Sequence, residues 1–319
     1  EFVPPTEPNG SSISRNWTEI NVSIEESDLK NITFDWNGTS YTAYDDSLVL
    51  MMNFDNVSAL GENDSHFVDV SGQSNDGNCN IVFSCPELDT SYGRYGLGAD
   101  FNAGMSDYIG ISDDPSISGM KEVSVSVWAR MDTWQFSAYP LIAGKSNTGS
   151  EREYRLRGET GSPDKIVWHI SNDTNDPGTA ETYIDVATLS GEWTHFVGTY
   201  NGSYLKLYVN GVLEDEAAGE TGGTADAAGE FGIGGYSDGS EFFDGQIDEV
   251  RVWNRELSAD EIQILYMSNL RRYDTDKWEL YINRTGLLDS TYTYQALAYD
   301  TLENWNSTDL RYITISTEP

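Results

Sequence analysis

The stretch FDGQIDEVRVWNRELSADEI, residues 243–262, decides how the chain around it folds. An acidic turn that contains a glycine leads into a predicted strand at 247–253, which is rich in β-branched and aromatic residues. A short helix is predicted over 259–266, because Ser258 and Glu261 have the spacing of a capping box. The stretch therefore predicts a strand that is followed at once by a helix.

The predicted strand contains two adjacent acids, Asp248 and Glu249. If side chains alternate strictly, Asp248 lies on the same face as Val250, where an isolated carboxylate costs several kcal/mol. Such a carboxylate needs a partner. The sequence leaves three partners open: a metal ion, an arginine such as Arg251 or Arg94, or the backbone N–H groups of a tight turn.

The composition is strongly acidic. Acids outnumber bases by 53 to 18, which gives a formal net charge of −35. This balance excludes nucleic acid as a partner, because phosphate binding needs a basic surface. It suits an extracellular setting in which cations screen the repulsion between carboxylates, although solubility alone also explains it. No run of 18 apolar residues is present, so no membrane span is predicted.

Asn-x-Ser/Thr sequons are dense, which fits a glycosylated surface protein. They lie at Asn9, Asn16, Asn21, Asn31, Asn37, Asn56, Asn63, Asn172, Asn201, Asn283 and Asn306.

The chain has two cysteines, Cys79 and Cys85, in the segment CNIVFSC. Their spacing favours a local disulfide over a metal site. The loop is short, so its stabilising effect should stay below the ~3 kcal/mol of a 15-residue loop.

The rest of the chain is predicted to be almost entirely β-structure. Asn-Gly pairs at 37–38, 201–202 and 210–211 mark hairpin turns, because both residues tolerate positive φ angles. The predicted strands are 17–24, 31–38, 39–44, 48–55, 124–131, 165–171, 193–200, 203–209 and 212–216.

The two ends of the chain have similar strand patterns and differ in this from the middle. Residues 11–44 offer about three strands and residues 277–316 about three or four, too few in either part to close a sandwich. Together they make one Ig-like sandwich of roughly seven strands. We therefore predict a discontinuous Ig-like domain over 1–45 plus 271–319. A second domain, over 46–270, is predicted to be inserted into one of its loops.

The segment LLDSTYTYQALAYDTLENWNST, residues 287–308, resembles a stretch of Ig-like and fibronectin-type surface modules. The resemblance implies that Tyr292 acts as a corner tyrosine, with its hydroxyl tied to the backbone. Ser290 stands where these modules usually have Gly. With the sequons, the two ends also resemble repeat units of large archaeal surface proteins.

The middle of the chain contains a series of motifs in a fixed order. They are LVLMMNFD (48–55), VDVSGQSNDGN (68–78), YGLGADFNAGMSDYIGIS (95–112), VSVSVWARM (123–131), GEWTHFVGTYNGSYLKLYVNGVLE (191–214) and the stretch at 243–262. The series resembles the concanavalin A-like jelly roll of laminin G-like and pentraxin domains. The resemblance implies that strands 48–55 and 247–253 are neighbours in one sheet, which would bring the ends of the inserted domain together.

Related jelly rolls hold a structural Ca²⁺ between the first-strand region and the last strand. The resemblance therefore implies a calcium ion with oxygen ligands beside Asp248. The residues predicted to share it are Asp55, Asp69, Asn75 and Asp76. Pentraxins place further calcium at their ligand face, where this chain offers the thinner set Asp238 and Glu241.

Three classes of function compete, and the first is an enzyme. Some jelly rolls of this superfamily hydrolyse glycans with carboxylates two residues apart on one strand. The nearest match is Asp244-x-Gln246-x-Asp248, which lacks a third acid. The three histidines are scattered, and no Ser or Cys is arranged with them as a nucleophile. We predict that the chain is not an enzyme.

The second class is a carbohydrate-binding module. Sugar sites combine exposed aromatic rings with a few polar groups. Aromatic residues in loops also serve as lids on a core, so both roles stay open for them. The predicted ligand-binding residues are Trp134, Tyr139, Tyr236 and Asp238, with Phe136, Phe242 and Phe243 as further candidates.

The third class is a structural or adhesive repeat of an extracellular, cell-surface protein. Pro-containing segments at both ends are typical of semi-rigid linkers to neighbouring repeats of the same polypeptide. The acidity and the sequons agree with this class, which the sequence favours. Its partners would be glycans or other surface proteins. Carbohydrate recognition by the same jelly roll is the alternative.

Overall fold

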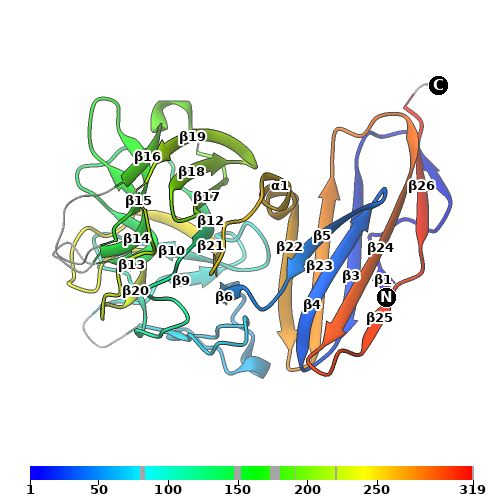
Figure 1. Cartoon of the computed structure of the whole chain (residues 1–319), viewed down its shortest axis with the longest axis horizontal. Coiled ribbons are helices and arrows are strands. Elements are labelled where there is room, and N and C mark those ends of the chain that lie inside the picture. Colours follow the sequence, from blue (N-terminus) through cyan, green and yellow to red (C-terminus); the bar gives the residue numbers. More distant parts are fainter. Residues whose placement is uncertain (80–82, 147–151, 173–179, 190, 220, 318–319) are drawn as a thin grey trace. The chain divides into compact units, whose positions relative to one another are not determined.

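The computed structural model describes residues 1–319 except 80–82, 147–151, 173–179, 190, 220 and 318–319 (Figure 1). The chain divides into two compact units. The terminal unit consists of Glu1–Asp46 and Asp260–Pro319, and the central unit of Ser47–Ala259. No helix in the described part of the chain has the length and apolarity that crossing a membrane requires.

The terminal unit is built from strands of both chain ends. Its elements are β1 (Phe2–Val3), β2 (Ser11–Ile13), β3 (Thr18–Glu25), β4 (Leu29–Trp36), β5 (Thr39–Tyr44), α1 (Ala259–Met267), β22 (Ser268–Asp274), β23 (Lys277–Arg284), β24 (Ser290–Asp300), β25 (Trp305–Ser307) and β26 (Arg311–Ile315). One sheet has the order β1-β3-β23-β22, and the other β2-β26-β24-β4-β5 with β25 on β24. Strands from the two ends therefore pair directly, β3 with β23 and β4 with β24.

Side chains from both ends fill the interior of the terminal unit. Ile20 and Phe34 from the first end and Leu280 and Ile313 from the second are all buried. The Tyr292 hydroxyl donates a hydrogen bond of 3.1 Å to the Leu288 carbonyl, the kind of backbone contact implied for a corner tyrosine. The assignment of this sandwich to the Ig-like class stays a prediction.

The helix predicted at 259–266 is confirmed as α1, but its surroundings differ from the prediction. No strand was predicted at 268–274, where β22 forms and pairs antiparallel with β23. Two adjacent arginines, Arg271 and Arg272, interrupt the alternation that would have marked it. Because α1 runs directly into β22, the units divide near residue 260 and not at 271.

The central unit contains the elements that correspond to the resembled jelly roll. Its elements are β6 (Leu48–Met52), η1 (Ser58–Leu60), β7 (His66–Phe67), β8 (Gly77–Asn78), β9 (Glu87–Asp89), β10 (Gly98–Phe101), β11 (Ile109–Ile111), β12 (Val123–Arg130), β13 (Leu141–Ser146), β14 (Arg152–Glu159), β15 (Lys165–Ile170), β16 (Ala180–Asp185), η2 (Val186–Thr188), β17 (Thr194–Tyr200), β18 (Tyr204–Val209), β19 (Val212–Ala218), β20 (Phe231–Ile233) and β21 (Gly245–Trp253). The β12 sheet has the order β19-β18-β17-β12-β21-β10-β9, with β6 paired to β21. The β14 sheet has the order β16-β15-β14-β13-β20-β11-β8-β7.

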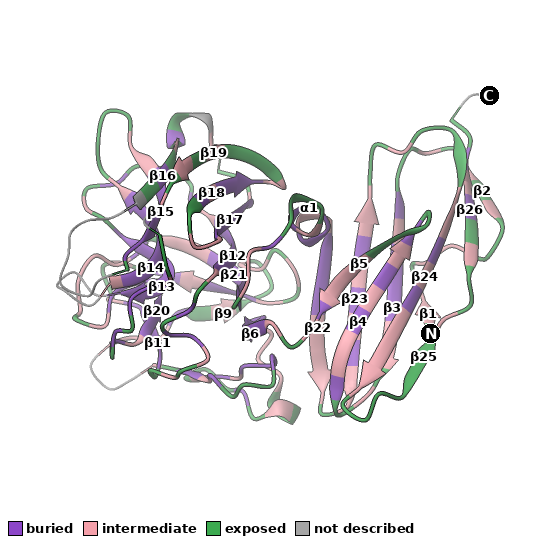
Figure 2. Ribbon diagram, viewed as in Figure 1, coloured by how far each residue is buried: buried purple, intermediate pink, exposed green. Residues whose placement is uncertain are grey.

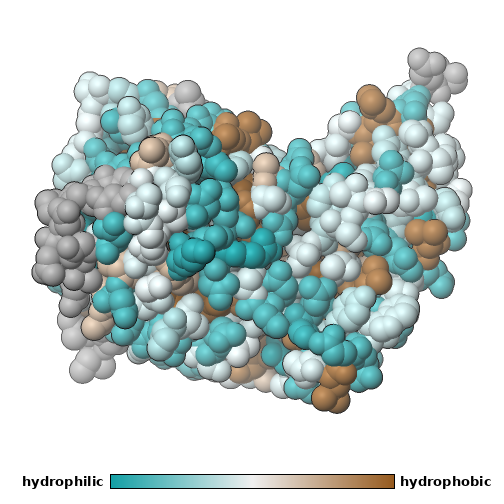
Figure 3. All heavy atoms as spheres, in the orientation of Figure 1, coloured by the Kyte–Doolittle hydropathy of each residue, from teal (hydrophilic) through white to brown (hydrophobic). Residues whose placement is uncertain are grey.

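The core of the central unit lies between these two sheets, where the buried strand residues gather (Figure 2). In the regular strands alternate residues point into it, such as Val125 and Val127 from β12 and Tyr154 and Leu156 from β14. The intervening residues lie on the outer faces of the sheets. Hydrophilic residues cover most of the visible surface, in keeping with the acidic composition (Figure 3).

The strands that open and close the central unit are neighbours, as predicted. β6 pairs antiparallel with β21, with Met52 opposite Val250. Two of the three predicted Asn-Gly turns have positive φ at both residues, at 37–38 and 210–211. At 201–202 only Gly202 has a positive φ, so this turn is of another type.

The adjacent acids of β21 are explained by an irregularity in the strand. Ile247 and Val250 both face the core, so two residues separate successive core positions where strict alternation allows one. Glu249 has φ = 53°, and the pairing with β12 shifts register between Ser126 and Trp128. These are the marks of a β-bulge. The prediction that Asp248 shares a face with Val250 is therefore wrong, because the bulge turns both acids away from the core.

Candidate functional site

A pocket of about 250 Å³ lies on the outer face of the β14 sheet. We call it the arginine–tyrosine pocket. Two glutamates, Glu181 and Glu241, complete its lining. The residues that give it its name and character are Arg152, Arg155, Arg157, His169, Tyr139 and Tyr236.

Strand alternation and register bring the polar residues of the pocket together. On β14, Arg155 and Arg157 alternate with core residues and so point outward. Arg155 lies opposite His169 of β15, and His169 lies opposite Glu181 of β16. One transverse row across three strands thus carries a guanidinium, an imidazole and a carboxylate.

The charges of Arg157 and Arg155 are compensated very differently. Arg157 forms ion pairs with Glu159 at 2.7 Å and Glu181 at 3.2 Å. Arg155 is only 6% exposed, and its described partners are the Ser146 hydroxyl at 3.2 Å and the His169 ring at 3.5 Å. Its Nε has no hydrogen-bond partner among the described residues. Burial, together with the nearby arginines, lowers the pKa of Arg155.

His169 is neutral in this environment. Burial, and then the charges of Arg155, Arg157 and Arg152, hold the pKa of His169 well below its ordinary value. Neutral imidazole can accept a hydrogen bond, so His169 is suited to hold the guanidinium of Arg155 in place without adding charge.

The two tyrosines give the pocket its aromatic surface. Tyr139 is 43% exposed, and the guanidinium carbon of Arg157 lies 5.2 Å from its ring centroid. Tyr236 is fully buried, with Arg155 at 5.9 Å from its ring centroid. Burial raises the pKa of Tyr236, so its hydroxyl stays protonated. The pocket therefore offers one exposed ring beside several fixed hydrogen-bond donors.

The other residues predicted to bind a ligand lie elsewhere. Trp134 is 4% exposed and is a core residue, with ring centroids 5.5 Å from Phe196 and 6.5 Å from Phe243. Asp238 accepts a hydrogen bond of 2.6 Å from the Ser240 hydroxyl and does not line the pocket. The arginines and His169 were not predicted, although the alternation of Arg155 and Arg157 with apolar residues in β14 was a usable signal.

The residues predicted to hold calcium already have partners within the protein. Asp69 accepts hydrogen bonds from the backbone N–H groups of Met51, Ser71 and Asn75, each at 2.9 Å. Asp76 accepts one from the Asp69 N–H, also at 2.9 Å. These hydrogen bonds hold the backbone of the loop over 68–78.

Asp248 has the backbone partners that the sequence left open. It is fully buried and accepts N–H bonds from Arg94, Tyr95 and Glu249 at 2.8, 3.0 and 2.9 Å. Asp55 accepts one from Leu97 at 2.9 Å. No group of three or more Asp, Glu, His or Cys among the described residues is placed to hold a metal ion. The calcium site stays a prediction. The carboxylate oxygens described above already accept backbone hydrogen bonds and do not by themselves indicate a metal site.

The carboxylates considered for catalysis do not share one site, because Asp244 and Gln246 line a pocket of about 480 Å³ that Asp248 does not reach. Asp248 is fully buried, as described above. Asp244 accepts a hydrogen bond of 3.2 Å from the Ala103 N–H, and the Gln246 amide donates to Asp100. Burial lowers the pKa of His195 to about 3, and its ring stacks on Trp128 at 4.9 Å. His195 is thus a neutral structural residue.

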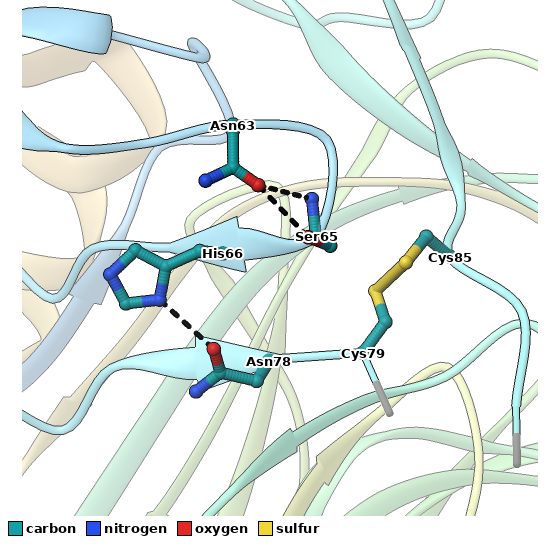
Figure 4. Close-up of a disulfide and its surroundings, with 6 residues drawn as sticks. All are labelled: Asn63, Ser65, His66, Asn78, Cys79 and Cys85. Atoms are coloured by element: carbon teal, nitrogen blue, oxygen red, sulfur yellow. Dashed lines mark hydrogen bonds between the residues drawn. A yellow bond between two sulfur atoms is a disulfide. The ribbon is translucent and has the colours of Figure 1, made fainter. Parts of the chain in front are cut away.

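The disulfide between Cys79 and Cys85 is present, as predicted (Figure 4). It lies beside the Asn63 sequon, whose Oδ1 accepts hydrogen bonds from the Ser65 N–H at 3.0 Å and hydroxyl at 2.9 Å (Figure 4). Glycosylation of the sequons stays a prediction, and one of them is poorly placed for it. Asn21 is buried, and its amide nitrogen donates to Pro4 and Glu279.

The sequence and the fold can now be compared with known proteins. The family model described as the concanavalin A-like lectin/glucanases superfamily (Laminin_G_3) matches residues 102–263, just over half of the chain. No curated protein is similar enough to match the sequence.

Several solved structures have a similar fold. The binding domain of paraclostridial mosquitocidal protein 1 has a TM-score of 0.52 and 16% identity, over 71% of this chain and 54% of that chain. The botulinum neurotoxin serotype D ligand-binding domain, in complex with N-acetylneuraminic acid, has a TM-score of 0.51 and 17% identity, over 72% and 54%. The match spans about half the length of those chains, and at these identities it shows the fold alone. The predicted all-β fold with a jelly roll is confirmed, and the chain belongs to the concanavalin A-like lectin/glucanases superfamily.

Proposed function

We propose that the central unit is a non-catalytic carbohydrate-binding module and that the arginine–tyrosine pocket is its binding site. From the sequence this was the alternative, and a structural or adhesive repeat of a cell-surface protein was favoured. The observation that supports it is the pocket itself, in which an exposed ring lies beside buried, oriented polar groups. Such an arrangement suits a sugar, which has an apolar ring face and a rim of hydroxyls.

Each part of the pocket has a role in this proposal. Tyr139 offers an aromatic face on which a sugar ring can stack. Glu181 and Glu241 can accept hydrogen bonds from sugar hydroxyls, and Arg157 can donate to them. Because His169 and Arg155 are held by strand register, the donors are fixed before a ligand arrives, which reduces the entropy cost of binding.

The similar botulinum neurotoxin D structure was solved with a sugar, N-acetylneuraminic acid, which makes carbohydrate the first ligand class to test. An extracellular location, display on a cell surface and glycan partners fit the acidic composition and the sequons, and they are part of the proposal. The calcium ion remains a separate prediction that the pocket does not need.

Binding to a glycan array tests the proposal. The parent protein should bind a defined set of glycans, and Tyr139→Ala should lose most of that binding because the stacking face is gone. Tyr204→Ala is the matched control, since Tyr204 is a similarly exposed tyrosine on β18 and does not line the pocket. No binding by the parent, or equal binding by all three proteins, would contradict the proposed site.

A further inference from the structure

We propose that the ligand of the arginine–tyrosine pocket is an anionic sugar, and that its carboxylate or sulfate pairs with Arg155. This inference rests on the proposed function and specifies its substrate class. The observation that carries it is a buried guanidinium that lines a pocket and has no anionic partner within ion-pair distance among the described residues.

Arg155 has unused hydrogen-bonding capacity. A guanidinium carries five N–H donors, and the described contacts of Arg155 use two of them, one to Ser146 and one to His169. Nε is among the donors that remain. A guanidinium that donates two parallel N–H bonds to one carboxylate or sulfate forms the strongest kind of hydrogen-bonded pair in proteins.

Arg155 differs in this respect from its neighbour on the same strand. Arg157 has Glu159 and Glu181 within 2.7 and 3.2 Å, so its charge is already balanced. A buried charge is strongly disfavoured unless it is paired. The unbalanced charge of Arg155 is therefore a cost to the free protein that a bound anion would remove.

The charge of the whole chain makes this local arrangement more informative. A protein with a net charge of −35 repels anions in general. Three of its 18 basic residues nevertheless line this single small pocket, and β14 supplies all three. With Glu181 and Glu241 as the only carboxylates of the described lining, the three arginines leave it with an excess of positive charge, which a site for neutral sugars would not need.

The dimensions of the pocket also limit the ligand. Its volume of 250 Å³ lies just below the usual range of ~300–1,000 Å³ for small-molecule sites. We therefore expect it to hold one acidic sugar unit, with Tyr139 against the ring and Arg155 against the anionic group, and not a long stretch of polysaccharide.

Titration calorimetry with matched pairs of methyl glycosides tests the inference. Methyl glucuronide and methyl galacturonide are compared with methyl glucoside and methyl galactoside, which carry CH₂OH in place of the carboxylate. Galactose 6-sulfate against galactose provides a sulfate arm, and N-acetylneuraminic acid a further carboxylate arm. We expect at least one acidic ligand to bind about 10- to 100-fold more tightly than its neutral counterpart, the range for hydrogen bonds to a charged group.

Substitutions of Arg155 test whether this residue causes the preference for acidic over neutral ligands. Arg155→Met should abolish the preference for the acidic ligand, and Arg155→Lys should restore part of it. Lys165→Met is the matched control, because Lys165 is a cation on the adjacent strand β15, stacks on Tyr183 and does not line the pocket. It should leave the preference unchanged.

The possible results separate the two proposals. Equal binding of acidic and neutral ligands, or an acidic preference that survives Arg155→Met, overturns the inference and leaves the carbohydrate-binding proposal intact. A parent protein that binds no glycan on the array and none of these ligands contradicts the proposed function itself.

Discussion

Two groups of buried charged residues lie on the outer sides of the two sheets of the central unit, and they differ in how their charges are compensated. Beside the β12 sheet, Arg251 pairs with Glu249 at 2.7 Å, and Asn53 donates to the same carboxylate at 2.5 Å. Asp248 accepts three backbone N–H bonds there. In the pocket of the β14 sheet, Arg155 has no carboxylate partner among the described residues.

The difference separates a structural cluster from a binding site. Buried charges that are matched within the protein stabilise one arrangement of the backbone, here the bulge at Glu249 with its positive φ. A buried charge that lacks a match, and that lines a pocket, is poised for a ligand. The predictions below test this contrast, starting with the largest expected effect.

The first prediction breaks the matched pair. Arg251→Met should lower the free energy of unfolding by about 3–5 kcal/mol at pH 8, because it leaves the buried carboxylate of Glu249 without its counter-charge. Urea unfolding followed by tryptophan fluorescence measures the change. A loss below about 1 kcal/mol would show that the pair does not have the structural role assigned to it.

The second prediction concerns pH. Burial raises the pKa of Glu249 from 4.5 to about 7. The folded state therefore binds more protons than the unfolded state between these values, so the stability that Glu249 contributes is present below pH 4.5 and is lost as the pH rises through 7. Glu249→Gln should remove this part of the pH dependence, roughly 3 kcal/mol across the interval. Urea unfolding of the parent and the variant at pH 4.5 and at pH 8 measures this change. If the unfolding free energy changes equally between the two pH values in both proteins, the assignment of this pH dependence to Glu249 is contradicted.

The third prediction applies the same substitution to the unmatched charge. Arg155→Met should change the free energy of unfolding by no more than about 1 kcal/mol, or should stabilise the free protein, because no buried carboxylate is left without a partner. The measurement is the same urea unfolding used for Arg251→Met. If Arg155→Met lowers the free energy of unfolding as much as is expected for Arg251→Met, Arg155 has a structural role. The proposed difference between the Glu249–Arg251 cluster and the pocket is then contradicted.

The fourth prediction is the smallest and concerns calcium. Since Asp248 and Asp69 already accept backbone hydrogen bonds, an ion bound near them should add only modestly to stability. Removal of calcium with EDTA should lower the melting temperature by a few degrees if the ion predicted from the sequence is bound. Identical melting curves with EDTA and with added Ca²⁺ would contradict the calcium prediction.

The sequence predicted many strands of both units and the pairing of β6 with β21, but it predicted neither β14 nor β16. Alternating apolar residues and Asn-Gly turns are local signals that survive in the fold. The bulge at Asp248–Glu249 was missed because strict alternation was assumed, and only the cross-strand register reveals the additional residue. The position of β22 was missed because adjacent arginines hide its alternation.

The candidate site was predicted only in part. Tyr139 and Tyr236 were identified as aromatic residues in loops, but whether such a ring faces the core or the surface depends on tertiary packing, which placed Trp134 in the core. Arg155 and His169 are 14 residues apart and meet only because β14 and β15 pair in one register. Compensation of charge is likewise a property of the folded arrangement and cannot be read from residue types alone.

A crystal structure of the protein soaked with N-acetylneuraminic acid, or with the tightest acidic glycan on the array, tests the central claim most directly. The account predicts a sugar ring against Tyr139 and an anionic oxygen within hydrogen-bonding distance, about 2.7–2.9 Å, of the Arg155 guanidinium. A sugar bound elsewhere while this pocket stays empty, or one that turns its anionic group away from Arg155, would contradict it.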